Sequence, residues 1–145
     1  NTPTPTQTPA PVLSPAQERE QLLASVPDVL RTDWTDPNPK QPVGVSGDIV
    51  WSDAAQKGYM RLRGLPANDP AKSTYQLWIF DENQDEKTPV DGGVFDVAPN
   101  GEVIVPIDAK IAVKKPKMFA ITEEKPGGVV VSKREKIVAL AKVSV

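Results

Sequence analysis

The acidic stretch at residues 81–86 could bind a cation, because it begins like a calcium-binding loop. It reads Asp-Glu-Asn-Gln-Asp-Glu, which places oxygen ligands at its first, third and fifth positions. A helix-loop-helix calcium site also needs glycine at the sixth position and glutamate at the twelfth. Here those positions hold Glu86 and Gly92. We therefore interpret the stretch as a solvated hairpin loop, and another kind of cation site is the alternative.

Two pairs of residues could support hydrolysis, but neither has the required arrangement. Glu123 and Glu124 are adjacent, so on a strand their side chains point to opposite faces and cannot act together on one substrate. We expect one of them to be exposed and the other to be bonded locally. Ser132 and Lys133 are sequence neighbours, but no glycine-bracketed nucleophile motif surrounds them.

The composition excludes several kinds of chemistry. The chain has no His and no Cys, which excludes imidazole bases, thiol nucleophiles and the usual zinc ligands. We predict no catalytic residue, no cofactor site and no metal site, and a serine hydrolase with a lysine base is the disfavoured alternative. The formal net charge of -2 gives no reason to expect a nucleic-acid partner.

A basic run lies around Pro116 and consists of Lys110, Lys114, Lys115 and Lys117. Lysine and proline commonly protect the exposed edge of a sheet from pairing with another chain. We expect this run to protect a sheet edge. Contact with an anionic lipid headgroup or a wall polymer is the alternative.

The element that must position these groups is a strand at residues 73–81, the most aromatic run of the sequence. Alternate residues would form two faces, with Tyr75, Leu77 and Ile79 on one and Gln76, Trp78 and Phe80 on the other. Both faces are largely apolar, which predicts a central strand that is covered on each side.

Six further segments have the pattern of strands: residues 47–52, 59–65, 92–97, 102–108, 118–123 and 136–145. Residues 129–132 extend a strand or form a bulged loop. The glycine pairs at 92–93 and 127–128 indicate turns or bulges. Short, regular spacing between turns predicts an all-β fold, an antiparallel β-sandwich of immunoglobulin-like architecture with about seven strands. A barrel is the less favoured alternative.

The first 46 residues differ from the rest. Residues 1–13 are rich in Thr and Pro, and we expect a disordered stalk or linker. Ser14 and Gln17 form a capping box for a helix that carries an apolar stripe of Leu22, Leu23 and Val26. This helix is expected to pack on the β domain, and binding of a partner is the alternative. Residues 29–43 are predicted to be irregular, with Trp34 docked on the domain. The predicted units are thus 1–13, 14–46 and a β-sandwich domain at 47–145.

Five motifs occur in a fixed order along the strands: Gly64, Leu65 and Pro66; Tyr75, Gln76, Leu77 and Trp78; Gly92, Gly93 and Phe95; Phe119, Ala120, Thr122, Glu123 and Glu124; Gly127 and Gly128. Together they resemble the C-terminal, extracytoplasmic domain of the anti-sigma-K factor (RskA-type) family. The resemblance covers about residues 47–145. Ile121 stands where the family usually has valine, and Lys125 precedes Pro126.

The resemblance implies a regulatory or sensor domain of a single-pass transmembrane anti-sigma factor. In such a protein a cytoplasmic segment binds the sigma factor. Regulated proteolysis, first outside the membrane and then within the membrane, releases the sigma factor. Residues 1–13 would be the stalk next to the membrane. The sequence contains no signal peptide and no apolar run of membrane-spanning length, so we expect a fragment whose targeting signals lie upstream. A free-standing secreted or surface module that binds a ligand or wall polymer is the alternative.

The resemblance names no ligand-binding residues for this domain. Since ligand contacts on sandwiches tend to lie on loops, we expect any sensing site at residues 66–73, 81–91 or 125–134.

Overall fold

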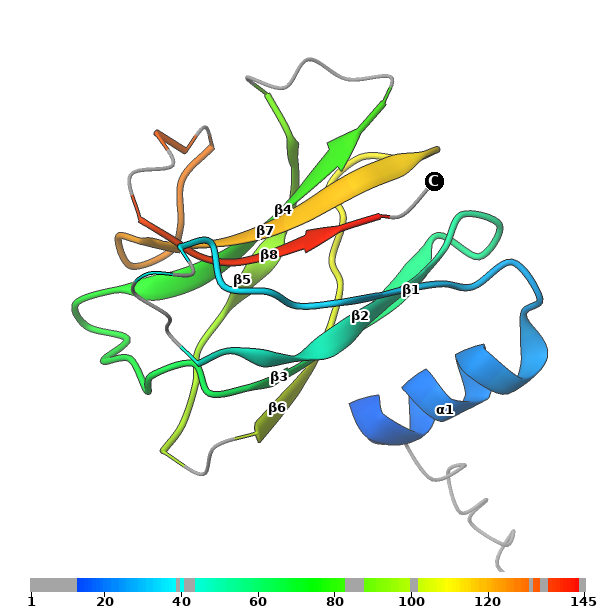
Figure 1. Cartoon of the computed structure of the whole chain (residues 1–145), viewed down its shortest axis with the longest axis horizontal. Coiled ribbons are helices and arrows are strands. Elements are labelled where there is room, and N and C mark those ends of the chain that lie inside the picture. The colour runs from blue at the N-terminus through cyan, green and yellow to red at the C-terminus, as the bar shows by residue number, and fades with distance from the viewer. Residues whose placement is uncertain are drawn as a thin grey trace, which may run out of the picture.

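The structure is a computed structural model that describes residues 13–38, 40, 44–82, 88–99, 102–130, 132–133 and 136–143. Its elements are α1 (Pro15–Ser25), β1 (Leu30–Asp33), β2 (Ser46–Ser52), β3 (Lys57–Arg63), β4 (Thr74–Asp81), β5 (Val90–Phe95), β6 (Glu102–Pro106), β7 (Pro116–Glu124) and β8 (Ile137–Lys142). The strands form two antiparallel sheets, in the orders β1-β2-β3-β6 and β5-β4-β7-β8 (Figure 1). The predicted antiparallel β-sandwich is therefore confirmed.

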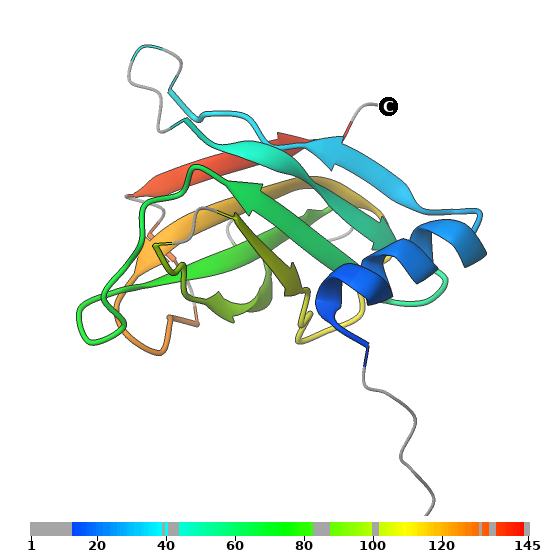
Figure 2. The same cartoon turned by 90° about the horizontal axis from the view of Figure 1, so that it is seen from below.

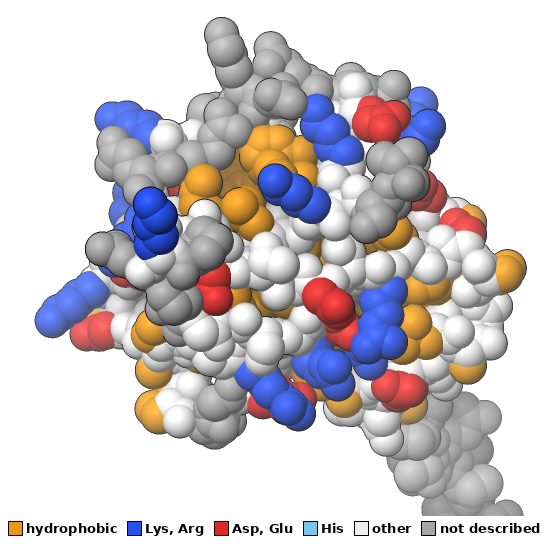
Figure 3. Space-filling model, viewed as in Figure 1, with side chains coloured by type: hydrophobic (Ala, Val, Ile, Leu, Met, Phe, Trp, Pro, Cys, Tyr) orange, Lys and Arg blue, Asp and Glu red, His pale blue; other side chains and the backbone are white. Residues whose placement is uncertain are grey.

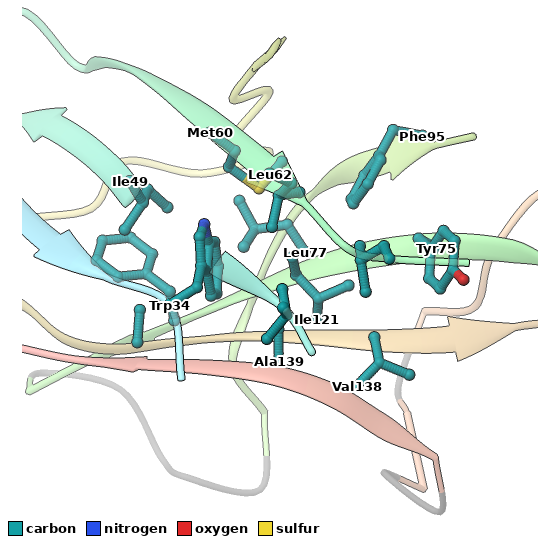
Figure 4. Close-up of a cluster of buried hydrophobic side chains, with 14 of the residues drawn as sticks. Trp34, Ile49, Met60, Leu62, Tyr75, Leu77, Phe95, Ile121, Val138 and Ala139 are labelled. Atoms are coloured by element: carbon teal, nitrogen blue, oxygen red, sulfur yellow. The ribbon is translucent and has the colours of Figure 1, made fainter. Parts of the chain in front are cut away.

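The core lies between the two sheets, where alternate residues of facing strands meet (Figure 4). Ile49 and Met60 come from one sheet, and Leu77 and Ile121 come from the other. Trp34 is also part of this core, and its Nε1 donates to the carbonyl oxygen of Asp48 at 3.2 Å. Its predicted docking on the domain is confirmed.

β4 is an inner strand, and all eight of its residues are buried. Its inward face, which includes Tyr75 and Leu77, belongs to the main core. Its outward face, which includes Trp78 and Phe80, belongs to a second apolar cluster on the other side of the sheet. The prediction of a central strand covered on both sides is confirmed.

Hydrogen bonds join the two sheets at both of their edges. Next to β1, Thr35 and Leu140 of β8 exchange backbone hydrogen bonds of 2.7 and 3.0 Å. At the opposite edge the chain leaves β6 and passes to the other sheet, where Asp108 N donates to Gly92 O at 2.9 Å. Hydrogen bonding between the sheets at both edges is a feature that the sandwich shares with a barrel, the less favoured alternative.

The helix α1 lies against the outer face of the β1-β2-β3-β6 sheet (Figure 2). The predicted capping box is present: Gln17 N donates to Ser14 Oγ at 3.2 Å, and Ser14 N donates to Gln17 Oε1 at 2.9 Å. Leu22 packs with Val50 and Tyr59 in an apolar cluster that is separate from the main core. The expected packing of the helix on the β domain is confirmed.

One prediction about secondary structure needs correction. Residues 29–43 were expected to be irregular, but Leu30–Asp33 form β1, in which only Leu30 and Thr32 are half-buried. One apolar residue in four gives no recognisable alternation, so pairing with β2 decides the strand. Residues 129–132 were expected either to extend a strand or to form a bulged loop, and their described positions are not assigned to a strand.

The lysine run does not lie in an edge strand. Lys110, Lys114 and Lys115 lie in the connection from β6 to β7, and Lys117 lies in β7, an inner strand. Only the backbone of Lys110 covers an edge, because its N–H donates to Asp91 O of β5 at 3.0 Å. The sequence signal could not distinguish a connection that crosses an edge from the edge strand itself.

Candidate functional site

Two of the three loops that were expected to sense a ligand lie at the same end of the sandwich. β4 and β7 are paired so that Thr74 lies opposite Glu124 and Asp81 lies opposite Pro116. The loop before β4, residues 66–73, therefore lies at the same end as the loop after β7. The loop at residues 81–91 follows β4 and lies at the other end.

A groove of about 500 Å³ opens beside the first of these loops. Its lining comes from that loop and from β4, β7, β8 and the position before β8: Pro66, Ala67, Asn68, Asp69, Lys72, Ser73, Tyr75, Glu123, Lys136 and Val138. Lys136 Nζ lies 3.1 Å from Glu123 Oε2, so these two charges neutralise each other. The groove combines apolar walls with a charged rim, which suits binding better than catalysis.

Asn68 holds the loop beside the groove in place. Its backbone N–H donates to Val97 O at 3.2 Å, and its side-chain oxygen accepts from Val97 N at 2.7 Å. Its amide nitrogen donates to Ser73 O and to Asp96 Oδ1, both at 2.8 Å. One side chain thus ties the two ends of the loop to the segment after β5.

Tyr75 forms part of the groove lining. Its hydroxyl donates to Pro66 O at 2.7 Å, and its ring stacks on Phe95 with 5.7 Å between the ring centroids. Burial raises the pKa of Tyr75, and the nearby negative charge of Glu123 adds to this rise. The hydroxyl therefore stays protonated at neutral pH and acts as a hydrogen-bond donor, not as a base.

The motif at residues 75–78 contacts the other motifs of the resemblance. Tyr75 bonds to Pro66, as described above. Trp78 Nε1 donates to Thr122 Oγ1 at 2.9 Å. Leu77 packs over Gly92, where an added Cβ would lie 2.7 Å from Leu77 Cδ2.

Gln76 makes the most extensive of these contacts. Its side chain is 1% exposed and forms two hydrogen bonds of 2.9 Å with the backbone N–H and C=O of Val129. Gly128 lies directly against it, since an added Cβ would be 2.8 Å from Gln76 Oε1. Four consecutive residues of β4 therefore each fix a different part of the chain.

The groups considered for hydrolysis are held in structural hydrogen bonds. Ser132 Oγ and Thr122 Oγ1 both donate to Glu124 Oε2. Glu123 lies on the opposite face, as predicted, and pairs with Lys136. Both glutamates are half-buried and bonded, so the expectation that one would be exposed was wrong.

The acidic stretch that begins like a calcium loop follows β4, and residues 83–87 lie outside the described part of the chain. Its first residue, Asp81, is 3% exposed and accepts a hydrogen bond from Lys114 N at 2.9 Å. No group of three or more metal-binding side chains occurs among the described residues.

A charged cluster that lies beneath α1 was not predicted. Asp48 of β2 is fully buried, and its carboxylate accepts from Arg19 of α1 at 2.9 and 3.0 Å. Arg31 of β1 donates to the same carboxylate from Nε at 2.8 Å, and Arg61 Nη2 lies 3.6 Å from it. The available signal was that Arg19 shares a helix face with Leu22, three residues away.

Charged side chains of both signs are mixed on one face of the molecule. Figure 3 shows Lys and Arg side chains interspersed with Asp and Glu over the face that it presents. Lys115 Nζ, for example, lies 3.5 Å from Glu82 Oε2, and Lys110 pairs with Asp108. A surface of this kind gives no extended field of one sign.

A family of known domains matches most of the chain. Its description is "Anti-sigma-K factor rskA, C-terminal", and the match covers residues 2–132. It begins earlier than the resemblance suggested, so it includes α1 and β1, and it ends before β8. No curated protein and no solved structure gives a significant match to the chain.

None of the described helices is long and apolar enough to cross a membrane.

The family is one of regulators and not of enzymes, and it implies a sigma factor as partner. On the match over residues 2–132, the chain belongs to the family of anti-sigma-K factor C-terminal domains.

Proposed function

We propose that this chain is the extracytoplasmic regulatory domain of a single-pass transmembrane anti-sigma factor. A missing cytoplasmic segment of the parent protein would bind the sigma factor. An extracytoplasmic protease would cleave the parent protein first, and a second cleavage within the membrane would then release the sigma factor. The observation that carries the proposal is the family match, which runs from the Thr/Pro stretch through α1 and most of the sandwich.

In this proposal residues 1–13 form the stalk that connects the domain to the membrane. Four prolines in the first twelve residues favour an extended chain, which holds a domain away from its anchor. The stalk leads directly into α1, which packs on the sandwich. The state of the folded domain is thereby connected to the segment that a protease outside the membrane would reach.

A specific observation favours the second candidate function, a free-standing secreted or surface module. The groove beside residues 66–73 has the volume of a small-ligand site, and its apolar walls and charged rim fit an amphipathic ligand or a wall polymer. The groove is compatible with the first function as well, in which it would hold the sensed molecule.

The test uses the full-length parent protein with a reporter for sigma-dependent transcription. Alkaline phosphatase fused after Val145 is expected to be active, since that enzyme matures only outside the cytoplasm. Deletion of residues 14–145 is expected to change the reporter signal. An inactive fusion, or a reporter that does not respond to the deletion, would contradict the proposal and leave the ligand-binding module.

A further inference from the structure

We propose that α1 is a releasable latch, which detaches from the sandwich while the two sheets stay folded and so exposes residues 13–27 to an endopeptidase. The latch is a property of this chain alone. Only its consequence, the regulated cleavage, rests on the proposed function.

α1 contributes no residue to the main core between the two sheets. Only Arg19 and Leu22 of the helix are buried. Leu22 belongs to a small cluster with Val50 and Tyr59 on the outer face of the sheet, and the half-buried Leu23 and Val26 also pack against this cluster. Loss of the helix would expose this small cluster and leave the residues between the two sheets covered. Local opening is favoured where few apolar contacts hold an element.

Release of α1 leaves the buried carboxylate of Asp48 with charged partners. Asp48 keeps the two contacts of 2.8 Å from Arg31 and the nearby Arg61 when Arg19 departs. Breaking a buried ion pair is usually costly because one charge stays unpaired. Here three guanidinium groups share one carboxylate, so departure of Arg19 also relieves repulsion between like charges.

Docking also buries a polar atom of α1, Arg19 Nε, that forms no hydrogen bond to the described residues. A buried donor without a partner destabilises the state in which it is buried. An isolated helix of eleven residues is also marginal in water, so a detached α1 would become extended chain.

The boundary of the released segment is set by Asp28. Its carboxylate accepts from Ser52 Oγ at 2.9 Å and from Ala54 N at 3.1 Å, which fixes the chain immediately after Pro27. β1 then continues the sheet. Detachment is therefore limited to residues before this anchor. An endopeptidase would hydrolyse one peptide bond there with one water molecule, giving a new carboxylate and a new amine.

The test combines amide hydrogen exchange with cleavage by thermolysin on the 145-residue chain. All three tryptophans, Trp34, Trp51 and Trp78, lie in the sandwich, so their fluorescence reports its unfolding separately from α1. Amides of α1 are expected to exchange at least tenfold faster than those of β4. Thermolysin is expected to cut within residues 20–24 while the fluorescence stays native.

The matched variants are R19Q and R31Q, which each remove a guanidinium group from the same carboxylate. Because Arg19 belongs to the latch, R19Q is expected to raise α1 exchange and cleavage by roughly tenfold to a hundredfold, the equivalent of one charge-assisted hydrogen bond. R31Q is expected to leave both rates unchanged or lower, because Arg31 belongs to β1 and its loss relieves repulsion of Arg19. Tyr59→Phe, which removes the 3.0 Å bond to Glu18 of α1, is a second variant with the same expected direction as R19Q.

The latch would be overturned if the amides of α1 exchanged only together with those of β4. It would also be overturned if R19Q and R31Q changed exchange and cleavage equally. These outcomes are measured without a sigma factor or a membrane. Failure of the proposed function would appear instead in the parent protein, as a reporter that does not respond when the domain is deleted.

Discussion

Gly128 shows how a single residue can fix a loop on a sheet. Its φ is +79°, a left-handed conformation that other residues rarely adopt. A Cβ at this position would lie 2.6 Å from Val94 Cγ1 and 2.8 Å from Gln76 Oε1. Glycine is therefore required here both by the positive φ and by the lack of room for a Cβ atom. Gly127 has a φ of +84° but no atom within 4 Å of an added Cβ.

These two glycines give a matched pair of substitutions. G127A is expected to lower the free energy of unfolding by about 1 kcal/mol, the cost of a left-handed alanine. G128A is expected to lower it by about 3 kcal/mol, because overpacking adds to that cost. Urea denaturation of both variants tests the difference. Equal losses would show that the contact with Gln76 and Val94 does not matter.

Tyr59 makes stability depend on pH in the alkaline range. Burial, and then its hydrogen bond to Glu18, raise its pKa from about 10 to about 12. Below pH 10 the hydroxyl is protonated in both the folded and the unfolded states, so stability is fully present. Between pH 10 and 12 only the unfolded state loses the proton, so stability falls as the pH rises.

We expect the free energy of unfolding to drop by on the order of 2 kcal/mol from this group between pH 10 and 12. Tyr59→Phe, compared with the unchanged chain over the same range, is expected to show a smaller drop. Guanidinium denaturation at each pH measures the free energy of unfolding of both proteins. An identical pH dependence in the two proteins would exclude Tyr59 as the source.

At the scale of elements, Asp48 connects α1, β1, β2 and β3. Its carboxylate is 1% exposed, whereas the side chain of Arg31 is 57% exposed. A buried charge that loses its partner destabilises a protein far more than an exposed one does. The three arginines around Asp48 consequently differ in how much they depend on it.

D48N is expected to lower the free energy of unfolding by about 3 kcal/mol, because it removes the buried carboxylate that three guanidinium groups share. R31Q is the control, with an expected loss of less than about 1 kcal/mol. Thermal and urea denaturation followed by circular dichroism test both variants. A loss for D48N no greater than that for R31Q would contradict a central role of the carboxylate.

For the whole molecule, the family match and the folded unit end at different places. The match ends at residue 132, but β8 follows it and contributes Val138, Ala139 and Ala141 to the core. β8 also pairs with β7 and reaches Thr35 next to β1, which closes one edge of the sandwich. The folded unit therefore needs residues beyond the match.

A chain truncated after Ser132 is expected not to fold. Loss of three core residues and of a whole ladder of strand pairing removes several kcal/mol, comparable with the whole stability of a small domain. Removal of residues 1–12 is the control and is expected to leave the unfolding midpoint unchanged, since this Thr/Pro stretch has little to bury. Near-ultraviolet circular dichroism and urea denaturation measure both. Cooperative unfolding of the truncated chain would show that β8 is dispensable.

The sequence was most informative where a signal is local. Alternation identified β2 to β8 to within a few residues, Ser14 and Gln17 marked the start of α1, and the apolar faces of β4 indicated an inner strand. Each of these signals needs only neighbouring residues. β1 was not predicted, because its four residues contain a single apolar side chain and depend on β2.

Contacts between distant residues were decided by the tertiary structure alone. Gln76 and Val129 are 53 positions apart, and Arg19 and Asp48 are 29 apart. No local pattern specifies such partners, because a buried amide or carboxylate can be satisfied by many groups and only the paired sheets bring one of them near. The sequence by itself therefore determined strands β2 to β8, the helix start and the lack of imidazole and thiol chemistry. The packing of the sheets determined which loops lie at the same end, what closes the edges and how α1 is held.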